Sequence, residues 1–481
     1  MSVQKELRSG LIITAISKYS NIFFELLITI LLARLLTPEE FGIVAVILVF
    51  TMLFNLLGEI GIGTAIVQNK ELQNTQIQSI FNYTILIAIV TAVGFVLISY
   101  PIAGFYENVE YIKIGRLLAC AILFYILNVV PQAILRKTKQ FLKLEGVILL
   151  VNIITGVLAI FLAYYGYGYY ALIYREILKA FFLFLINIFN IKFVPSRSLK
   201  IDGLRLIFNY SLFQFLFNIV NYISRNLASL LISKYMGAAN LGFYDRAYRL
   251  MLYPAQTLTF VITPVLHPVL AEYQNEPETI HSHYTKILEL LAFIGVPLSL
   301  FLFSSAEEVI LIMYGDQWTP SIPIFKILAL TIWSQMTLAS TGAIFQALGK
   351  TNLLFISGFI SAIITTLGVL FGVFSKDLEL IGYGILVAYT LNFFQGFYLL
   401  FSVGFNKSIF HFLLFFKLGF LSTIILLIGL IIVEYIAIDN IYYSVILKGT
   451  LLLLSMYLGA FFFKKNFIEY LNKKLKIILP K

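Results

Sequence analysis

Residues 11–50 read LIITAISKYSNIFFELLITILLARLLTPEEFGIVAVILVF, which is two apolar stretches separated by a short link at residues 34–37. A helix needs about 20 predominantly apolar residues to cross the hydrocarbon core of a bilayer. The first stretch reaches that length, and the second reaches it by continuing to residue 66. Backbone N–H and C=O groups find no water inside a bilayer, so a crossing segment pairs them within a helix. The stretch therefore predicts two membrane-spanning helices, over residues 10–33 and 38–66.

The same pattern continues through the rest of the chain. Of its 481 residues, 60% are hydrophobic and 12% are charged, and the mean hydropathy is +0.93; soluble domains carry about 25% charged residues. The apolar runs are continuous, whereas transmembrane barrels alternate over segments of about 10 residues. We expect an all-α polytopic membrane protein with about fourteen transmembrane helices. The twelve expected after residue 66 cover residues 77–100, 112–135, 141–164, 167–192, 205–234, 240–270, 284–304, 322–348, 351–374, 379–404, 411–434 and 441–463.

Basic residues lie mainly in the links on one side of the membrane. The net charge is +10, and the links that share a side with the two termini hold most of the lysines and arginines. Cytoplasmic loops carry such an excess, so both termini and the link at 193–203 are expected in the cytoplasm of a bacterial inner-membrane protein. The first helix follows the basic segment MSVQKELRSG and shows no small-residue cleavage site, so we expect it to be retained.

Several function classes find no support in the sequence. The links at 271–283 and 304–321 are too short to fold as catalytic domains, and no phosphate-binding Gly-Lys-Ser/Thr loop exists. His281 and His283 have no clustered cysteines or acids beside them, and Cys120 stands alone. We therefore expect a transporter without cofactor or metal, and not an enzyme or a nucleic-acid-binding protein.

Weak internal repeats indicate duplication. Residues 29–44 (TILLARLLTPEEFGIV) match residues 229–244 (SLLISKYMGAANLGFY) without gaps, with Gly42 on Gly242. Two shorter echoes follow in the same order, Ala133-Ile134 with Ala343-Ile344 and Gly166-Tyr167-Gly168 with Gly382-Tyr383-Gly384. Six helices per repeat give parallel repeats, related by an axis along the membrane normal. The predicted parts are an N-lobe (1–192), a link (193–203), a C-lobe (204–405), and two extra helices with a basic tail (406–481).

Polar side chains form a stripe along one helix of each repeat. The four polar positions of the first stripe are spaced 4, 3 and 4 residues apart, and the second stripe has the same spacing 200 residues later. That period places each set on one helical face. Lipid contact of a central charge costs about 2.5–3.5 kcal/mol, so we expect both faces to line a shared central cavity. The stripes are Thr14, Lys18, Asn21 and Glu25, and Gln214, Asn218, Asn221 and Arg225.

Two interpretations of the charged ends of these stripes stay open. Glu25 and Arg225 could form a static buried ion pair that locks the lobes together, or they could belong to a substrate site; a pair that breaks and re-forms during transport satisfies both.

Four further polar groups are candidates for binding or coupling. Asn55 and Glu59 share a helical face that lines the cavity or caps a helix. Arg175, Glu176 and Lys179 have the spacing to pair among themselves. Asp245 and Arg249 can pair, with Arg246 adding positive charge that attracts an anion. Glu289 is either a protonation site or a partner of Lys286. Coupling to H⁺ or Na⁺ would use Glu25, Glu59 or Glu289.

The segments LLARLLTPEEFGIVAVILVF (31–50) and LGFYDRAYRL (241–250), with AILRKTKQF, YGYGYYAL and QALGKTN, resemble the polysaccharide-transport family. This is the Wzx-like branch of the multidrug/oligosaccharidyl-lipid/polysaccharide exporter superfamily. The resemblance implies two six-helix lobes around a central cavity. Its implied substrate is an undecaprenyl-pyrophosphate-linked oligosaccharide, moved from the cytoplasmic to the periplasmic leaflet for surface polysaccharide synthesis. It also implies contact with polysaccharide-assembly proteins.

The chemical types of the candidate residues suit this implied substrate. The cations Lys18, Arg225 and Arg249 suit the pyrophosphate, and the amides suit sugar hydroxyls, while Glu25 and Glu59 make the lining mixed in sign. Lys417 and Lys448 are expected to snorkel at the ends of the last two helices. The alternatives are an ion-coupled multidrug exporter of the same superfamily and an integral-membrane polysaccharide polymerase or ligase.

Overall fold

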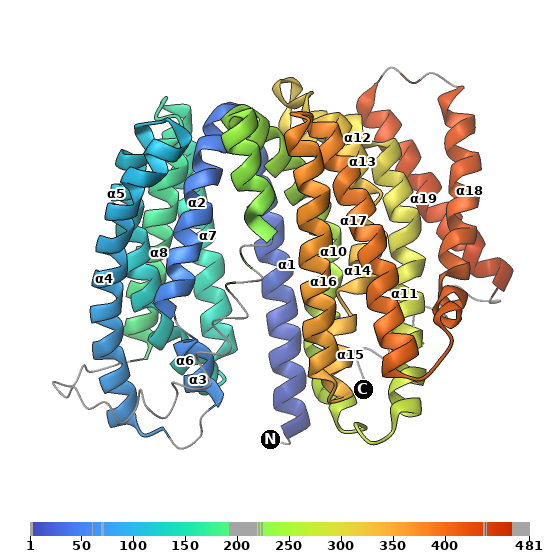
Figure 1. Ribbon diagram of the computed structural model, residues 1–481, viewed down its shortest axis with the longest axis horizontal. Helices are drawn as coiled ribbons and strands as arrows, with labels where there is room; N and C mark the ends of the chain where they lie inside the picture. Colours follow the sequence, from blue (N-terminus) through green and yellow to red (C-terminus); the bar gives the residue numbers. More distant parts are fainter. Residues whose placement is uncertain are drawn as a thin grey trace. The chain divides into compact units, whose positions relative to one another are not determined.

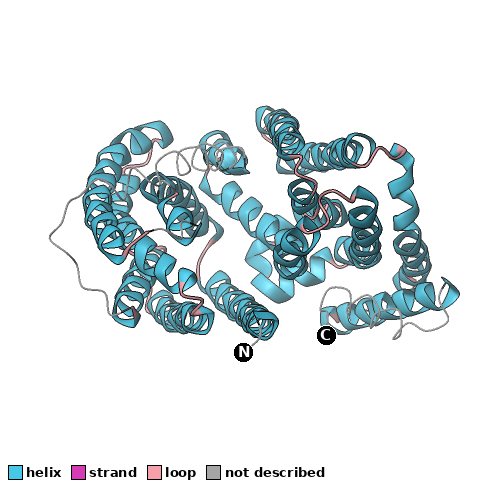
Figure 2. Cartoon of the chain, turned by 90° about the horizontal axis from the view of Figure 1, so that it is seen from below, coloured by secondary structure: helices cyan, strands magenta, loops and turns pink. Residues whose placement is uncertain are grey.

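A computed structural model describes residues 3–59, 61–68, 72–191, 219, 222, 225–435, 438 and 440–463. Within these ranges the secondary structure is helical, without strands, as Figure 2 shows. Ten helices there are long and apolar enough to cross a membrane, or eleven if one bent pair counts as a crossing. The chain is therefore an all-α polytopic membrane protein, while the count of fourteen stays a prediction.

The chain divides by its packing into residues 1–242 and 243–481. The first unit extends past the expected lobe boundary, and two contacts join its helices to residues beyond that boundary. The Tyr222 hydroxyl donates to the Val49 carbonyl at 2.7 Å, and the Tyr106 hydroxyl donates to the Leu230 carbonyl at 3.2 Å. The expected link at 193–203 lies outside the described residues, so the predicted lobe boundaries stay predictions.

In the first unit, helix α1 packs on α7, α7 on α8, α8 on α5, and α5 on α4 (Figure 1). The short helices α3 and α6 pack together at the lower end of this group in Figure 1. The bounds are α1 Val3–Leu35, α2 Pro38–Glu59, α3 Ile62–Gln68, α4 Asn74–Tyr106, α5 Glu110–Leu127, α6 Val129–Lys137, α7 Phe141–Tyr164 and α8 Tyr170–Asn190.

Two helices expected to be continuous are interrupted. The one expected over 38–66 stops at Glu59 and resumes as α3, with Gly61 between them in the left-handed region at φ 70°. Glycine adopts that conformation without steric cost. The one expected over 112–135 divides at Asn128, whose side-chain oxygen accepts a hydrogen bond from Asn187 Nδ2 at 2.9 Å. Both breaks lie at the same end of the unit and bring α3 against α6.

In the second unit, α11 packs on α14 and α18, and α16 on α17. The helix α10 (Ala238–Ala271) begins in the first unit. The other bounds are α11 Pro277–Ser304, α12 Ala306–Tyr314, η1 Asp316–Trp318, α13 Ser321–Ala329, α14 Ile332–Leu338, α15 Thr341–Ala347, α16 Thr351–Phe374, α17 Leu378–Tyr398, the π-helical turn η2 Leu399–Gly404, η3 Ile409–Phe416, α18 Lys417–Glu434 and α19 Ile441–Phe463.

The second unit corrects two expectations. The segment 304–321, expected as a polar link, contains α12 and a turn that buries Trp318. The helix expected over 322–348 is three short helices with a bend of 47° between residues 329 and 332. Hydroxyl side chains along this segment donate to nearby backbone carbonyls, Thr331 to Leu328 at 2.7 Å among them. Such bonds compete with the helical ladder and bend it.

Glycines permit two close helix crossings. A Cβ on Gly42 would lie 1.7 Å from the Ala238 carbonyl oxygen, and one on Gly242 would lie 2.0 Å from that of Pro38. Pro38 corresponds to Ala238, and Gly42 to Gly242, in the predicted repeat. The contact is thus reciprocal within the first unit, and the repeat stays a prediction. Within the second unit, Gly368 and Gly384 cross backbone to backbone in the same manner.

A buried ion pair joins the last helix, α19, to α12. Lys448 Nζ of α19 contacts the Glu308 carboxylate of α12 and donates to the Ser304 carbonyl at 2.8 Å. The Ser444 hydroxyl also donates to Glu308, at 2.6 Å. The expectation that Lys448 snorkels is therefore wrong, because this ammonium is held inside the protein by an acid in a segment expected to be a loop.

Candidate functional site

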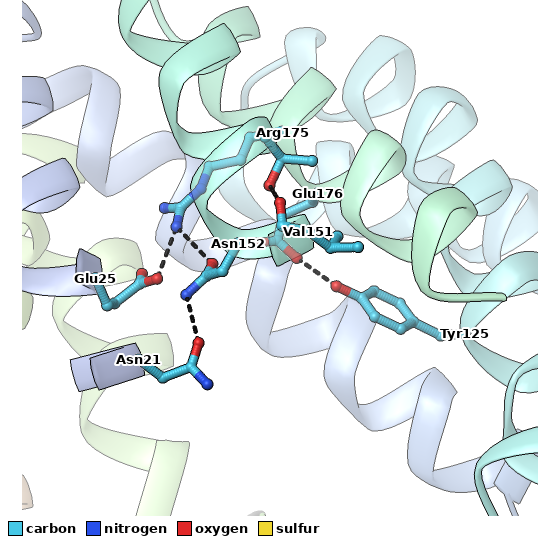
Figure 3. A network of polar contacts seen from close by, with 8 residues as sticks. Asn21, Glu25, Tyr125, Val151, Asn152, Arg175 and Glu176 are labelled. Carbon is cyan, nitrogen blue, oxygen red and sulfur yellow. Dashed lines mark hydrogen bonds and ion pairs between the residues drawn. The ribbon is translucent and has the colours of Figure 1, made fainter. Parts of the chain in front are cut away.

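A polar network joins the helices α1, α7 and α8 of the first unit. Arg175 of α8 is 7% exposed. Its Nη2 donates to Glu25 Oε2 of α1 at 2.7 Å and to Asn152 Oδ1 of α7 at 3.2 Å. Asn152 Nδ2 in turn donates to Asn21 Oδ1 of α1 at 3.5 Å, at the limit of a hydrogen bond. Figure 3 shows these side chains pointing toward one another.

The helix pattern explains why these groups meet. Asn21 and Glu25 are one helical turn apart and therefore lie on one face of α1. That helix packs on α7, and α7 packs on α8, so a side chain from each reaches the same point. A guanidinium buried in a membrane helix is costly unless it is paired. Glu25 neutralises it, and Asn152 accepts a second hydrogen bond.

The network has a second arm next to Arg175. The Tyr125 hydroxyl of α5 donates to Glu176 Oε2 at 2.9 Å (Figure 3). The expectation that Arg175, Glu176 and Lys179 pair among themselves is wrong for the first two, because their partners come from α1 and α5. The positive charge of Lys179 also interacts with the Glu25 carboxylate. The network thus contains groups of both signs.

The predicted pair of Glu25 with Arg225 also requires correction. Glu25 is bonded to Arg175 instead, while the Arg225 side chain is exposed. The repeat indicated Arg225 because this residue ends the duplicate stripe. The packing of α1 on α7, and of α7 on α8, instead brings Arg175 of the same unit to Glu25. Gln214, Asn218 and Asn221 lie outside the described residues. Their predicted roles, and those of Lys18 and Arg225 in binding, stay predictions.

In the second unit, the predicted pair of Asp245 and Arg249 is confirmed. Arg249 Nε donates to both carboxylate oxygens of Asp245 at 2.9 Å. Arg246 Nη2 donates to the same carboxylate at 2.5 Å. Two guanidiniums on one buried carboxylate leave this cluster with a positive charge. Glu289 is half-buried on α11, and its coupling role stays a prediction.

Asn55 and Glu59 line a cavity of about 230 Å³ inside the first unit. This cavity lies within one unit, so the predicted lining of a cavity shared by the two lobes stays a prediction. Tyr125 lines the same cavity and connects it through Glu176 to the neighbourhood of Arg175. Sequence patterns did not single out Tyr125, because a tyrosine in an aromatic-rich apolar helix carries no signal of its own.

Comparison with known proteins shows which proteins this chain resembles. The chain is 24% identical over 365 residues to the teichuronic acid biosynthesis protein TuaB of Bacillus subtilis (strain 168), covering 74% of each chain. It is 24% identical over 331 residues to the lipopolysaccharide biosynthesis protein WzxC of Escherichia coli (strain K12), covering 68% of this chain and 67% of the relative.

Among solved structures, the lipid II flippase MurJ in an inward closed conformation is similar, with a TM-score of 0.76 at 17% identity. It covers 95% of this chain and all of its own. The fold is therefore shared with that flippase. The family described as polysaccharide biosynthesis protein matches residues 31–323, more than half of the chain, and the protein belongs to this family, as its resemblance to the Wzx-like branch implied.

Proposed function

We propose that the protein moves a polyprenyl-pyrophosphate-linked oligosaccharide from the cytoplasmic to the outer leaflet of the bacterial inner membrane by alternating access. The observation that carries the proposal is the buried Arg175 guanidinium of α8, which is bonded to Glu25 and Asn152. The names of the relatives, which concern polysaccharide biosynthesis, and the fold shared with a lipid II flippase support it.

Arg175 is suited to the anionic head of such a substrate. A guanidinium binds phosphate oxygens through two parallel hydrogen bonds, which an ammonium cannot form. Glu25 is bonded to this cation, so a phosphate has to displace a carboxylate. The candidate acids for coupling this exchange to H⁺ or Na⁺ are Glu25, Glu59 and Glu289.

The remaining candidate residues are proposed to bind either the pyrophosphate head group or the sugars. Lys18, Arg225 and Arg249 are proposed to attract the pyrophosphate along its path. The amides Asn21, Gln214, Asn218 and Asn221 are proposed to bond sugar hydroxyls. Both termini are proposed to be cytoplasmic, and polysaccharide-assembly proteins are proposed to take over the product.

Deletion of the gene tests this function in cells. Lipid-linked repeat units should accumulate in the inner leaflet, and a plasmid copy should clear them. An unchanged lipid-linked pool and unchanged surface polysaccharide, in cells without a second flippase of this family, would contradict the proposal. Loss of resistance to organic cations without any change in that pool would instead favour the multidrug exporter.

A further inference from the structure

The cavity of about 230 Å³ lies between the broken ends of two helices in the first unit. The helix breaks after Glu59 and at Asn128 lie beside this space, because Glu59, Gly63, Asn128 and Val129 are among its lining residues. Its polar lining consists of Asn55 and Glu59 of α2, Tyr125 of α5, Asn128, and Gln132 and Arg136 of α6. Its apolar lining is Gly63, Ile126, Val129, Ala133 and Leu183.

The lining offers hydrogen bonds that the protein itself does not use. Asn55 Oδ1 is buried and has no protein partner. A buried oxygen without a partner costs about 1–3 kcal/mol, so a donor from outside the protein is expected there. Side-chain amides at Asn55, Asn128 and Gln132 provide both donors and acceptors.

The charges of the lining select the kind of molecule that fits. The Glu59 carboxylate would repel an anion, and the Arg136 guanidinium, which acts electrostatically on Glu59, would repel a metal cation. A neutral group rich in hydroxyls is compatible with both charges, because a hydroxyl donates to the carboxylate and accepts from the guanidinium. The apolar side chains of Ile126, Val129 and Leu183 suit the C–H faces of a ring.

The size of the cavity limits the occupant to one such group. Sites for drug-sized ligands measure about 300–1,000 Å³, and this cavity is smaller. Gly63 helps to keep it open, because a Cβ at that position would lie 3.1 Å from Glu59 Oε1 and press the carboxylate aside.

We propose that this cavity is a subsite for one sugar residue of the lipid-linked oligosaccharide. The inference rests on the proposed function and adds to it a place in the protein where the glycan is recognised. Tyr125 lines the cavity and donates to Glu176, the chain neighbour of Arg175, so the sugar subsite adjoins the proposed head-group site. Under the proposed orientation the subsite lies toward the cytoplasmic end of the first unit, from which the substrate is loaded.

A cysteine reporter inside the cavity tests the subsite. Gln132→Cys is made in a Cys120→Ser background, reconstituted in nanodiscs, and labelled with a small thiol reagent. Two probes are compared: the lipid-linked glycan extracted from cells that lack the gene, and undecaprenyl pyrophosphate without sugar. Gln140→Cys, which follows α6 and lies outside the cavity lining, is the matched control. The glycan lipid should slow labelling of Gln132→Cys by about tenfold, the sugar-free lipid should not, and neither should affect Gln140→Cys.

A second variant tests the subsite without introducing a cysteine into the cavity. Asn55→Ala should weaken binding of the glycan lipid, measured by native mass spectrometry, by about fivefold to tenfold, the loss expected for one buried hydrogen bond. Its binding of undecaprenyl pyrophosphate should not change, and Gln140→Ala should change neither.

The outcomes separate the inference from the proposed function. Binding of the glycan lipid without protection of Gln132→Cys, or equal protection by both lipids, would overturn the subsite and leave the flippase standing. If the wild-type protein does not bind the glycan lipid, both fail.

Discussion

Replacing Arg175 by methionine removes the guanidinium that joins α1 and α8 and leaves the Glu25 carboxylate without its partner. Breaking a buried ion pair in this way costs about 3–5 kcal/mol. The Arg175 side chain is 8% exposed and that of Glu25 is 33% exposed. Because water reaches part of the carboxylate, we expect the lower end, about 3 kcal/mol off the free energy of unfolding.

A double-mutant cycle turns this expectation into a measurement. Unfolding in detergent is followed for the wild type, Arg175→Met, Glu25→Gln and the double variant. The double variant should be less destabilised than the sum of the single ones, by about 1–3 kcal/mol, because neither residue is then left unpaired. Arg225→Met is the matched control, and since that side chain is exposed it should change stability by less than about 0.5 kcal/mol. Additive single effects, or a larger loss at Arg225 than at Arg175, would refute the assignment of the pair.

Three further predictions concern packing and orientation. Gly42→Ala should destabilise the first unit by about 1–3 kcal/mol through the clash with Ala238, whereas Gly104→Ala, with open space around its Cβ, should not; equal thermal stability of the two would contradict the close crossing. Lys448→Met should lower stability, because Glu308 is left buried and unpaired, and Glu308→Gln in the same chain should recover part of the loss; no recovery would argue against the ion pair. A cysteine at Ser196 in a Cys120→Ser background should resist an impermeant thiol reagent in intact cells, and ready labelling would reverse the proposed orientation.

The apolar lengths in the sequence predicted the long helices well. The helices expected at 141–164, 351–374 and 441–463 coincide with α7, α16 and α19. Length and hydropathy suffice there, because lipid leaves the backbone no other way to pair its groups. The breaks at Gly61, Asn128 and Thr331 were missed, since hydropathy averages over the few residues that interrupt a helix.

The site was predicted in part. Asn21 and Glu25 were identified because a polar stripe at helical spacing is visible in one segment. The partner was wrong because the repeat aligns equivalent residues, while Arg175 reaches Glu25 only through the packing of α8 near α1. One signal was available: an arginine in a membrane helix needs an acid, and it need not come from its own helix.

Transport by the purified protein tests the central claim most directly. Proteoliposomes are loaded on one leaflet with the lipid-linked glycan from cells that lack the gene, and a glycan-cleaving enzyme added outside reports how much crosses. The wild type should move the glycan lipid. Arg175→Lys should fold normally and move it at least about tenfold more slowly, because an ammonium lacks the paired donors that a pyrophosphate accepts. A wild-type protein that moves no glycan lipid, or an Arg175→Lys variant with the wild-type rate, would contradict the account.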